Sequence, residues 1–250
     1  MPKTTGLGDA YYLDGTDLSG DTQAVPTIHG GPAALDMTAI SNLAYVRQGG
    51  LRDGGIDWTS YFNPGVGLTH AKLSALPTAD VICSYFNQPL IGNPAASMVG
   101  KQVNYDPTRG TDGSLTFAVS AQANGFGLEW GQQLTPGRRV DGAATAAGPA
   151  NSLDTLAPAA FGASMYVHLF AFSGTSVTIK LQDSSDNITF TDVAGTSLTT
   201  LALTVPGAVR VTVPNTTTLR RYIAIGTVGT FTNADFAVNV HKFEIAGVVF

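Results

Sequence analysis

Alternation of apolar and polar residues is the most regular feature of this chain. A period of two residues is typical of a β-strand with one buried face. Polar turn segments separate such runs at roughly ten-residue intervals, which is the pattern of an all-β sandwich. The second half of the chain shows this pattern most clearly, with apolar residues at Val177, Ile179 and Leu181 and again at Val209, Val211 and Val213.

Residues 100–124 predict a strand, a turn region and a second strand. Val103 and Phe117 mark the two alternating segments, and Asp106-Pro107 and Asp112-Gly113 lie between them. Proline fixes the backbone angle φ, and glycine can adopt a positive φ without steric cost. Both dipeptides therefore favour turns. The segment carries no group suited to catalysis, which indicates a structural building block.

One helix is predicted, over residues 68–76. Leu68, Ala71 and Leu76 recur at helical spacing, and Pro77 ends the segment. A strand over residues 80–86 follows. The predicted fold class is therefore all-β with one short helix: a β-barrel or sandwich followed by a C-terminal β-sandwich domain.

A change of composition predicts the domain boundary. Residues 141–158 are mostly Ala, Gly, Pro, Ser and Thr, as in a linker or a long loop. We therefore expect two parts that fold separately. The predicted division is an N-terminal arm at 1–26, a β domain at 27–145, a linker at 146–160 and a β-sandwich at 161–250.

The N-terminal segment is rich in Gly, Asp and Thr, with one apolar cluster at Tyr11, Tyr12 and Leu13. Two interpretations are open. The segment is a disordered tail, or it is an arm that becomes ordered against a neighbouring subunit. The second interpretation makes these three residues candidate contacts between subunits.

The composition favours a surface covered by partners. Charged residues make up 12% of the chain, against about 25% in an average soluble domain. The net charge is −5, and no cluster of Lys and Arg is present that could neutralise phosphates. The start of the chain lacks an apolar leader, and no apolar run approaches the ~18 residues of a membrane span. We expect a protein made in the cytoplasm that does not cross a membrane.

Candidate chemistry is sparse, and we predict no catalytic, cofactor or metal site. The four histidines, His29, His70, His168 and His241, are widely separated and match no metal-binding spacing. His168 lies in an apolar strand and is expected to be packed and hydrogen-bonded. Cys83 is the single cysteine and is expected to be a small buried side chain.

Two acidic pairs flank turns, Asp53 with Asp57 and Asp183 with Asp186. Paired carboxylates bind Ca²⁺ in some proteins. Neither pair matches a known calcium-loop spacing, and aspartates in turns commonly bond their own backbone. We expect that local role, with the Asp183 loop as the better candidate for Ca²⁺.

Residues 35–63, residues 73–82 and residues 101–130 together resemble the major tail proteins of siphophages that infect actinobacteria. The first of these strings begins Leu-Asp-Met-Thr-Ala-Ile-Ser-Asn-Leu-Ala-Tyr. The resemblance implies a tail tube protein with one flanking helix, in hexameric rings that stack into a hollow tube. Residues 161–250 look like a decoration domain of such subunits.

The resemblance also implies a location and partners. The protein would belong to the virion tail and be made in the bacterial host. Its partners would be further copies of itself, a tape measure protein in the lumen, a tail terminator and a distal tail protein. Phage DNA would pass through without specific binding, which suits the mildly acidic net charge.

A second function class remains open: a carbohydrate-binding protein or adhesin that uses the C-terminal sandwich for attachment to a host surface. Aromatic side chains would carry it, and Tyr166, Tyr222 and Phe231 are the candidates. An enzyme has no supporting set of residues.

Overall fold

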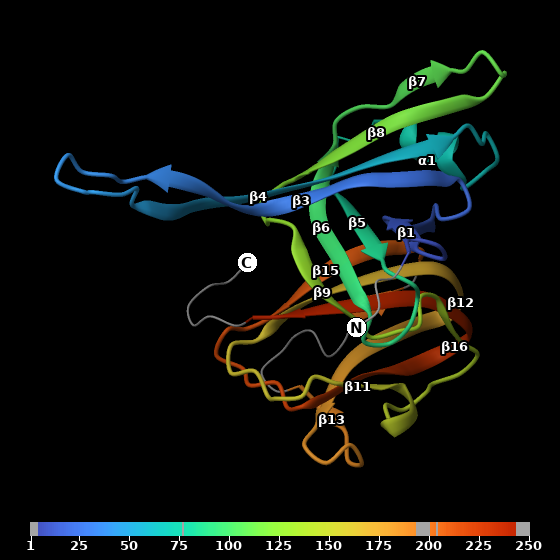
Figure 1. The fold of residues 1–250 in the computed structure, drawn as a ribbon. Helices are drawn as coiled ribbons and strands as arrows, with labels where there is room; N and C mark the ends of the chain where they lie inside the picture. The colour runs from blue at the N-terminus through green and yellow to red at the C-terminus, as the bar shows by residue number, and fades with distance from the viewer. Residues whose placement is uncertain (1–4, 77, 194–200, 204, 244–250) are drawn as a thin grey trace. The chain divides into compact units, whose positions relative to one another are not determined.

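The computed structural model describes residues 5–76, 78–193, 201–203 and 205–243. The fold is all-β, with one α-helix among the described residues, as the sequence predicts (Figure 1). The chain forms two compact units. Unit 1 holds Met1–Gly20, Ile82–Ser97 and Trp130–Phe250, and unit 2 holds Asp21–Val81 and Met98–Glu129.

Two very long strands form the centre of unit 1. β12 (Ala163–Ser184) and β16 (Tyr222–Lys242) pair antiparallel along almost their whole length. The pattern in the sequence predicted several short strands here. The structure instead keeps the strands continuous and shifts their register between Leu169 and Ser176, where β-bulges let both strands bend.

Shorter strands extend this pair on both sides. β15 (Gly207–Val213), β14 (Leu201–Leu203) and β13 (Thr191–Asp192) pair with β12. On the other side β16 pairs with β9, β10 and β11, and the sheet continues through β6, β5, β1 and β2. The bounds of these strands are β9 (Glu129–Gln133), β10 (Arg139–Asp141), β11 (Ser152–Asp154), β6 (Pro94–Gln102), β5 (Val81–Phe86), β1 (Ala10–Leu13) and β2 (Thr16–Asp17).

The main hydrophobic core belongs to unit 1. Val177, Ile179 and Leu181, which alternate in the sequence, are all at most 1% exposed. They pack in one cluster with residues of β15 and β16, including Val211 and Phe236. The period of two in the sequence therefore correctly identified the buried face.

The predicted linker is part of unit 1. Residues 141–158 contain a 3₁₀ turn (Pro149–Asn151) and β11, which pairs with β16. Leu153 is 5% exposed and belongs to the core cluster, and Thr145 exchanges backbone hydrogen bonds with Thr227. The structure therefore has no boundary between its two units at residues 146–160, because these residues all belong to unit 1. Small residues lack apolar area, but their backbones still pair in a sheet.

The N-terminal segment is not a free arm in the structure. β1 pairs with β5, and Tyr11, Tyr12 and Leu13 are each at most 2% exposed. The ring of Tyr12 packs edge-on against Phe86 and Phe170, with centroids 5.1 and 4.9 Å away. These side chains are core residues of unit 1. A contribution of the segment to contacts between subunits stays a prediction.

A buried chain of hydrogen bonds crosses unit 1 through His168, which is fully buried as the sequence predicts. The backbone N–H of Gly15 donates to Nδ1 of His168 at 3.2 Å. The proton of the ring therefore sits on Nε2, which lies 2.8 Å from Oγ of Ser84. Ser84 contacts Ser97, whose hydroxyl donates to Oδ1 of Asn239. This chain satisfies polar groups that burial would otherwise penalise.

Unit 2 is built around β4 (Arg47–Tyr61), which pairs with β3 (Thr22–Asp36) and with β8 (Leu115–Ala123). Ile56 and Trp58 of β4 are buried. β7 (Asp106–Arg109) forms a hairpin with β8. The helix α1 (Thr69–Leu73) lies within the predicted range. It is the only α-helix among the described residues, and none of their helices is long and apolar enough to cross a membrane.

The three turns predicted in unit 2 have different outcomes. Gly113 has a φ of 90° and forms the predicted turn between β7 and β8. Asp106-Pro107 instead begins β7. The turn expected between Asp53 and Asp57 is also absent, because these residues lie within β4. A Cβ on Gly54 would lie 2.7 Å from the backbone nitrogen of Leu128, so glycine serves close packing here.

Candidate assembly surface

The most unusual surface of unit 2 is a long hairpin, which we call the arm and define as residues 30–54. From Gly30 to Asp36, β3 pairs only with β4 among the described residues. β4 begins to pair with β8 at Gly55. Figure 1 shows β3 and β4 continuing together as a two-stranded ribbon. The arm is therefore two strands thick, with no third strand or helix paired to it in the described part of the chain.

Large apolar side chains of the arm face solvent. Ile40 and Leu43, in the loop of residues 37–46, are completely exposed, and Leu51 is 89% exposed. Scattered exposed apolar residues are normal on a protein surface, but a contiguous group marks an interaction site. The exposed group of the arm consists of Leu35, Met37, Ile40, Leu43, Tyr45, Val46 and Leu51.

The loop at the tip of the arm is closed by its own hydrogen bonds. The carboxylate of Asp36 accepts from the backbone N–H and the hydroxyl of Thr38, and these bonds lower the pKa of Asp36. The hydroxyl oxygen of Thr38 accepts from the N–H of Val46 at 3.0 Å. Oδ1 of Asn42 accepts from the N–H of Ala39 at 2.7 Å. The tip thus presents its apolar side chains from a defined backbone.

Such a hairpin is poorly stabilised by itself. An isolated two-stranded hairpin is marginal in water, and its two edges leave backbone groups available for pairing. Burying an exposed side chain the size of Ile40 or Leu43 contributes about 1.5–3 kcal/mol. A second protein surface against the arm would therefore stabilise both the arm and the complex.

Sequence analysis missed the arm and singled out Tyr11, Tyr12 and Leu13 instead. Residues 35–46 carry apolar side chains like those of a core strand. The sequence does not show that the other strands leave this segment exposed, with no third strand paired to it. The strand pairing in the structure is what identifies the arm.

Of the two acidic pairs, Asp53 and Asp186 bond backbone N–H groups close in sequence, whereas Asp183 bonds a distant one. Oδ2 of Asp183 accepts from the backbone N–H of Arg220, and Oδ1 of Asp53 accepts from the N–H of Gly54. Oδ1 of Asp186 accepts from the N–H groups of Ile188 and Thr189, both at 2.9 Å. In the described part of the chain, no group of three or more His, Cys, Asp or Glu is placed to hold a metal ion.

The turn at Asp186 makes a testable contribution to stability. Hydrogen bonds from the N–H of Thr189, the hydroxyl of Ser184 and the N–H of Ile188 lower the pKa of Asp186 to about 2. A pKa lowered by folding adds stability above the pKa of the unfolded chain, and that stability is lost as the pH falls through the folded pKa. We expect Asp186→Asn to be less stable than the wild type at about pH 5, with the difference closing toward pH 2. Urea midpoints across this range check it, and a difference that does not vary with pH would contradict it.

The four histidines lie in different elements, in β3, α1, β12 and β16. His70 contacts the hydroxyl of Tyr105 at 3.2 Å, and His241 bonds the backbone oxygen of Trp130. Cys83 is fully buried, and burial raises the pKa of its thiol to about 12. A thiol in that environment is protonated at neutral pH.

The aromatic residues proposed for glycan binding do not form a platform. Tyr166 is fully buried, and its hydroxyl accepts from Nε of Arg210 at 3.1 Å. Phe231 is 7% exposed and belongs to the core cluster. Tyr222 is partly buried, with the guanidinium of Arg221 over its ring.

Comparisons with known proteins leave the family open. No protein-family model matches the chain, and no curated protein matches its sequence. Among solved structures, the chain is similar to the tail of an empty gene transfer agent particle with C6 symmetry, at 13% identity and a TM-score of 0.41, over 51% of this chain and 98% of that one. It is also similar to the Dit protein of SPP1, at 13% identity and a TM-score of 0.35, over 94% of this chain and 99% of that one.

A third similar structure is the phage p2 baseplate, at 10% identity and a TM-score of 0.36, over 95% of this chain and 99% of that chain. All three TM-scores lie below 0.5. The all-β fold of this chain is established by its own strands, and the arm is described from its own contacts.

Proposed function

We propose that this protein is a structural virion protein, the major tail tube subunit of a long-tailed phage. In this proposal its copies form hexameric rings, and the rings stack into the tube that conducts DNA. Contacts with a tape measure protein, a tail terminator and a distal tail protein follow from that place in the virion. The particles in which the similar structures occur agree with this proposal, which does not rest on them.

The observation that carries the proposal is the arm. Its fully exposed Ile40 and Leu43 lie on a loop that its own hydrogen bonds hold in a defined conformation. A surface of this kind favours repeated association between copies of one chain, because a hairpin also offers open strand edges for pairing. The low charge of the chain adds little repulsion between copies.

The test compares assembly of the wild type with a double variant of the arm, Ile40→Asn with Leu43→Asn. Both side chains are exposed, so the monomer should fold normally. Losing two buried apolar contacts at about 1.5–3 kcal/mol each should raise the concentration needed for assembly by about a hundredfold or more. Negative-stain microscopy and light scattering at rising concentration measure this threshold.

The matched control is Val66→Asn with Ile188→Asn, which removes two exposed apolar side chains outside the arm (Val66 is 101% and Ile188 76% exposed). It should assemble at the wild-type threshold. If the arm variant forms rings or tubes at the wild-type threshold, the arm does not contribute to assembly. A wild type that stays monomeric at high concentration would end the tail tube proposal.

A further inference from the structure

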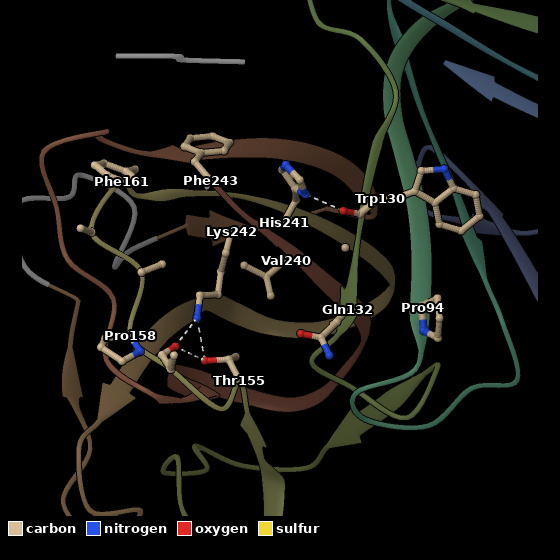
Figure 2. A pocket seen from close by; sticks show the side chains of 14 residues that line it. Pro94, Trp130, Gln132, Thr155, Pro158, Phe161, Val240, His241, Lys242 and Phe243 are labelled. Atoms are coloured by element: carbon tan, nitrogen blue, oxygen red, sulfur yellow. Dashed lines mark hydrogen bonds between the residues drawn. The ribbon is translucent and has the colours of Figure 1, made fainter. Parts of the chain in front are cut away.

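A cavity of about 680 Å³ lies in unit 1 (Figure 2). It is bounded by the start of β9, the end of β16 and the segment of residues 155–161. Pockets of about 300–1,000 Å³ with a few polar groups among apolar ones are typical of small-molecule sites. All of its lining residues belong to unit 1.

Lys242 gives the cavity its charge. Its Nζ donates to Oγ1 of Thr155 at 2.6 Å and to the backbone oxygen of Ala157 at 2.8 Å. Both acceptors are neutral, and none of the described residues pairs a carboxylate with this ammonium. Removal from water lowers the pKa of Lys242. An ammonium group has three donors, so one remains for a ligand, and an anion would compensate the lost hydration.

The side chain of Gln132 offers an acceptor to a ligand. Nε2 of Gln132 donates to the backbone oxygen of Gly92 at 3.3 Å, which leaves the side-chain oxygen to accept. Figure 2 shows that oxygen on the side of Gln132 nearest Lys242. His241 does not add a second acceptor, because it alternates with Val240 and Lys242 along β16 and its ring points away from Lys242 in Figure 2.

Apolar groups complete the wall. Pro158 and Phe161 lie on the segment that faces the end of β16, and Val240 lies between Lys242 and Gln132 in Figure 2. The cavity therefore combines one cationic donor, one side-chain acceptor and apolar surface. A simple anion would use only the donor, whereas a hydroxylated acid with an apolar ring face would use all three kinds of group.

We propose that this cavity binds an acidic monosaccharide, a hexuronate or a hexose phosphate, with its anionic group on Lys242 and a hydroxyl on the side-chain oxygen of Gln132. The site is independent of the tail tube proposal, because it lies in unit 1 and the arm lies in unit 2. It differs from the glycan site predicted from the sequence, since Tyr166, Tyr222 and Phe231 do not line it.

Calorimetric titration of the full chain with glucuronate, glucose 6-phosphate, glucose and acetate tests the proposal. We expect saturable binding of at least one of the two acidic sugars, with glucose and acetate weaker by about tenfold or more. The preferred acidic sugar identifies the anionic group. Absence of saturable binding for both acidic sugars would overturn the proposal, and so would acetate binding as tightly as they do.

The variant Lys242→Met keeps the length of the side chain and removes the charge. It should weaken binding of the acidic sugar by about ten- to a hundredfold, because a charge-assisted hydrogen bond is lost. The control is Lys180→Met in β12, which removes an ammonium paired with Asp192 at 2.8 Å, lies outside the cavity lining and should leave binding unchanged. Equal binding by the Lys242 variant would overturn the proposal.

A second variant keeps the test decisive if the Lys242 variant fails to fold, as circular dichroism would show. Gln132→Leu should weaken binding of the acidic sugar and leave the weak binding of acetate unchanged, because acetate has no hydroxyl for the lost acceptor. Unchanged sugar binding by this variant would contradict the placement of the hydroxyl.

Discussion

A chain ending at residue 150 is expected not to fold unit 1. The cut leaves Met1–Gly20, Ile82–Ser97 and the start of the third segment, and it removes β12 and β16. Of the buried cluster that forms the main core, Leu134 is the one member before the cut. β9 and β10 pair with β16, so the truncation removes their partner as well.

The expected result is therefore loss of cooperative unfolding of unit 1, together with aggregation, since unpaired strand edges and apolar faces become exposed. Circular dichroism and urea unfolding of the truncated and full chains measure this outcome. A truncated chain with a cooperative transition and soluble monomers would show that the first 150 residues contain a core of their own.

Proteolysis of the intact chain checks the same point without truncation. Thermolysin cleaves before large apolar residues, so Leu153 in the predicted linker and Leu43 at the tip of the arm are both candidate sites. Leu153 is 5% exposed and lies in a paired strand, while Leu43 is fully exposed in a loop. We expect early cleavage at the tip and protection at Leu153. Early cleavage near Leu153 would instead support the predicted linker at residues 146–160.

Gly174→Ala is expected to destabilise unit 1 strongly. Gly174 has a φ of 153° and lies where the register between β12 and β16 shifts. A Cβ there would lie 2.4 Å from Cα of Phe231 and 2.5 Å from the backbone oxygen of Thr230. Both atoms belong to the paired backbone, so relief requires the strands to move apart.

Backbone strain and overpacking each cost about 1–3 kcal/mol, so we expect a loss of about 2–6 kcal/mol in the free energy of unfolding. The matched control is Gly207→Ala in β15, where no atom lies within 4 Å of the new Cβ. The control should stay within about 1 kcal/mol of the wild type. Urea midpoints compare the two, and equal midpoints would show that the bend does not require glycine.

The sequence by itself determined the fold class and the buried faces of strands. Alternation at residues 177–181 and 209–213 depends on side chains within one strand, so it can be detected without knowing the partners of that strand. The burial of His168 and Cys83 follows from their apolar neighbours in the same way. The turn at Asp112-Gly113 is equally local, because the φ of glycine decides it.

Only the tertiary structure decided the units, because they are discontinuous. Strands distant in sequence build unit 1, and the pairing of β11 with β16 brings a segment of small residues into the core. Composition reports how much apolar area a segment carries, but it does not report which strand its backbone bonds to. For this reason the composition of residues 141–158 predicted a linker, although the segment pairs with β16.

The same limit explains why the sequence indicated the N-terminal segment, and not the arm, as the candidate contact surface. Tyr11, Tyr12 and Leu13 looked isolated in the sequence, yet β5 covers them. Ile40 and Leu43 have side chains of a type usually buried, yet both are completely exposed. Exposure depends on which surfaces remain after all strands have paired, which is a property of the whole fold. The residues that line the cavity around Lys242 likewise come from four separate segments that only the fold brings together.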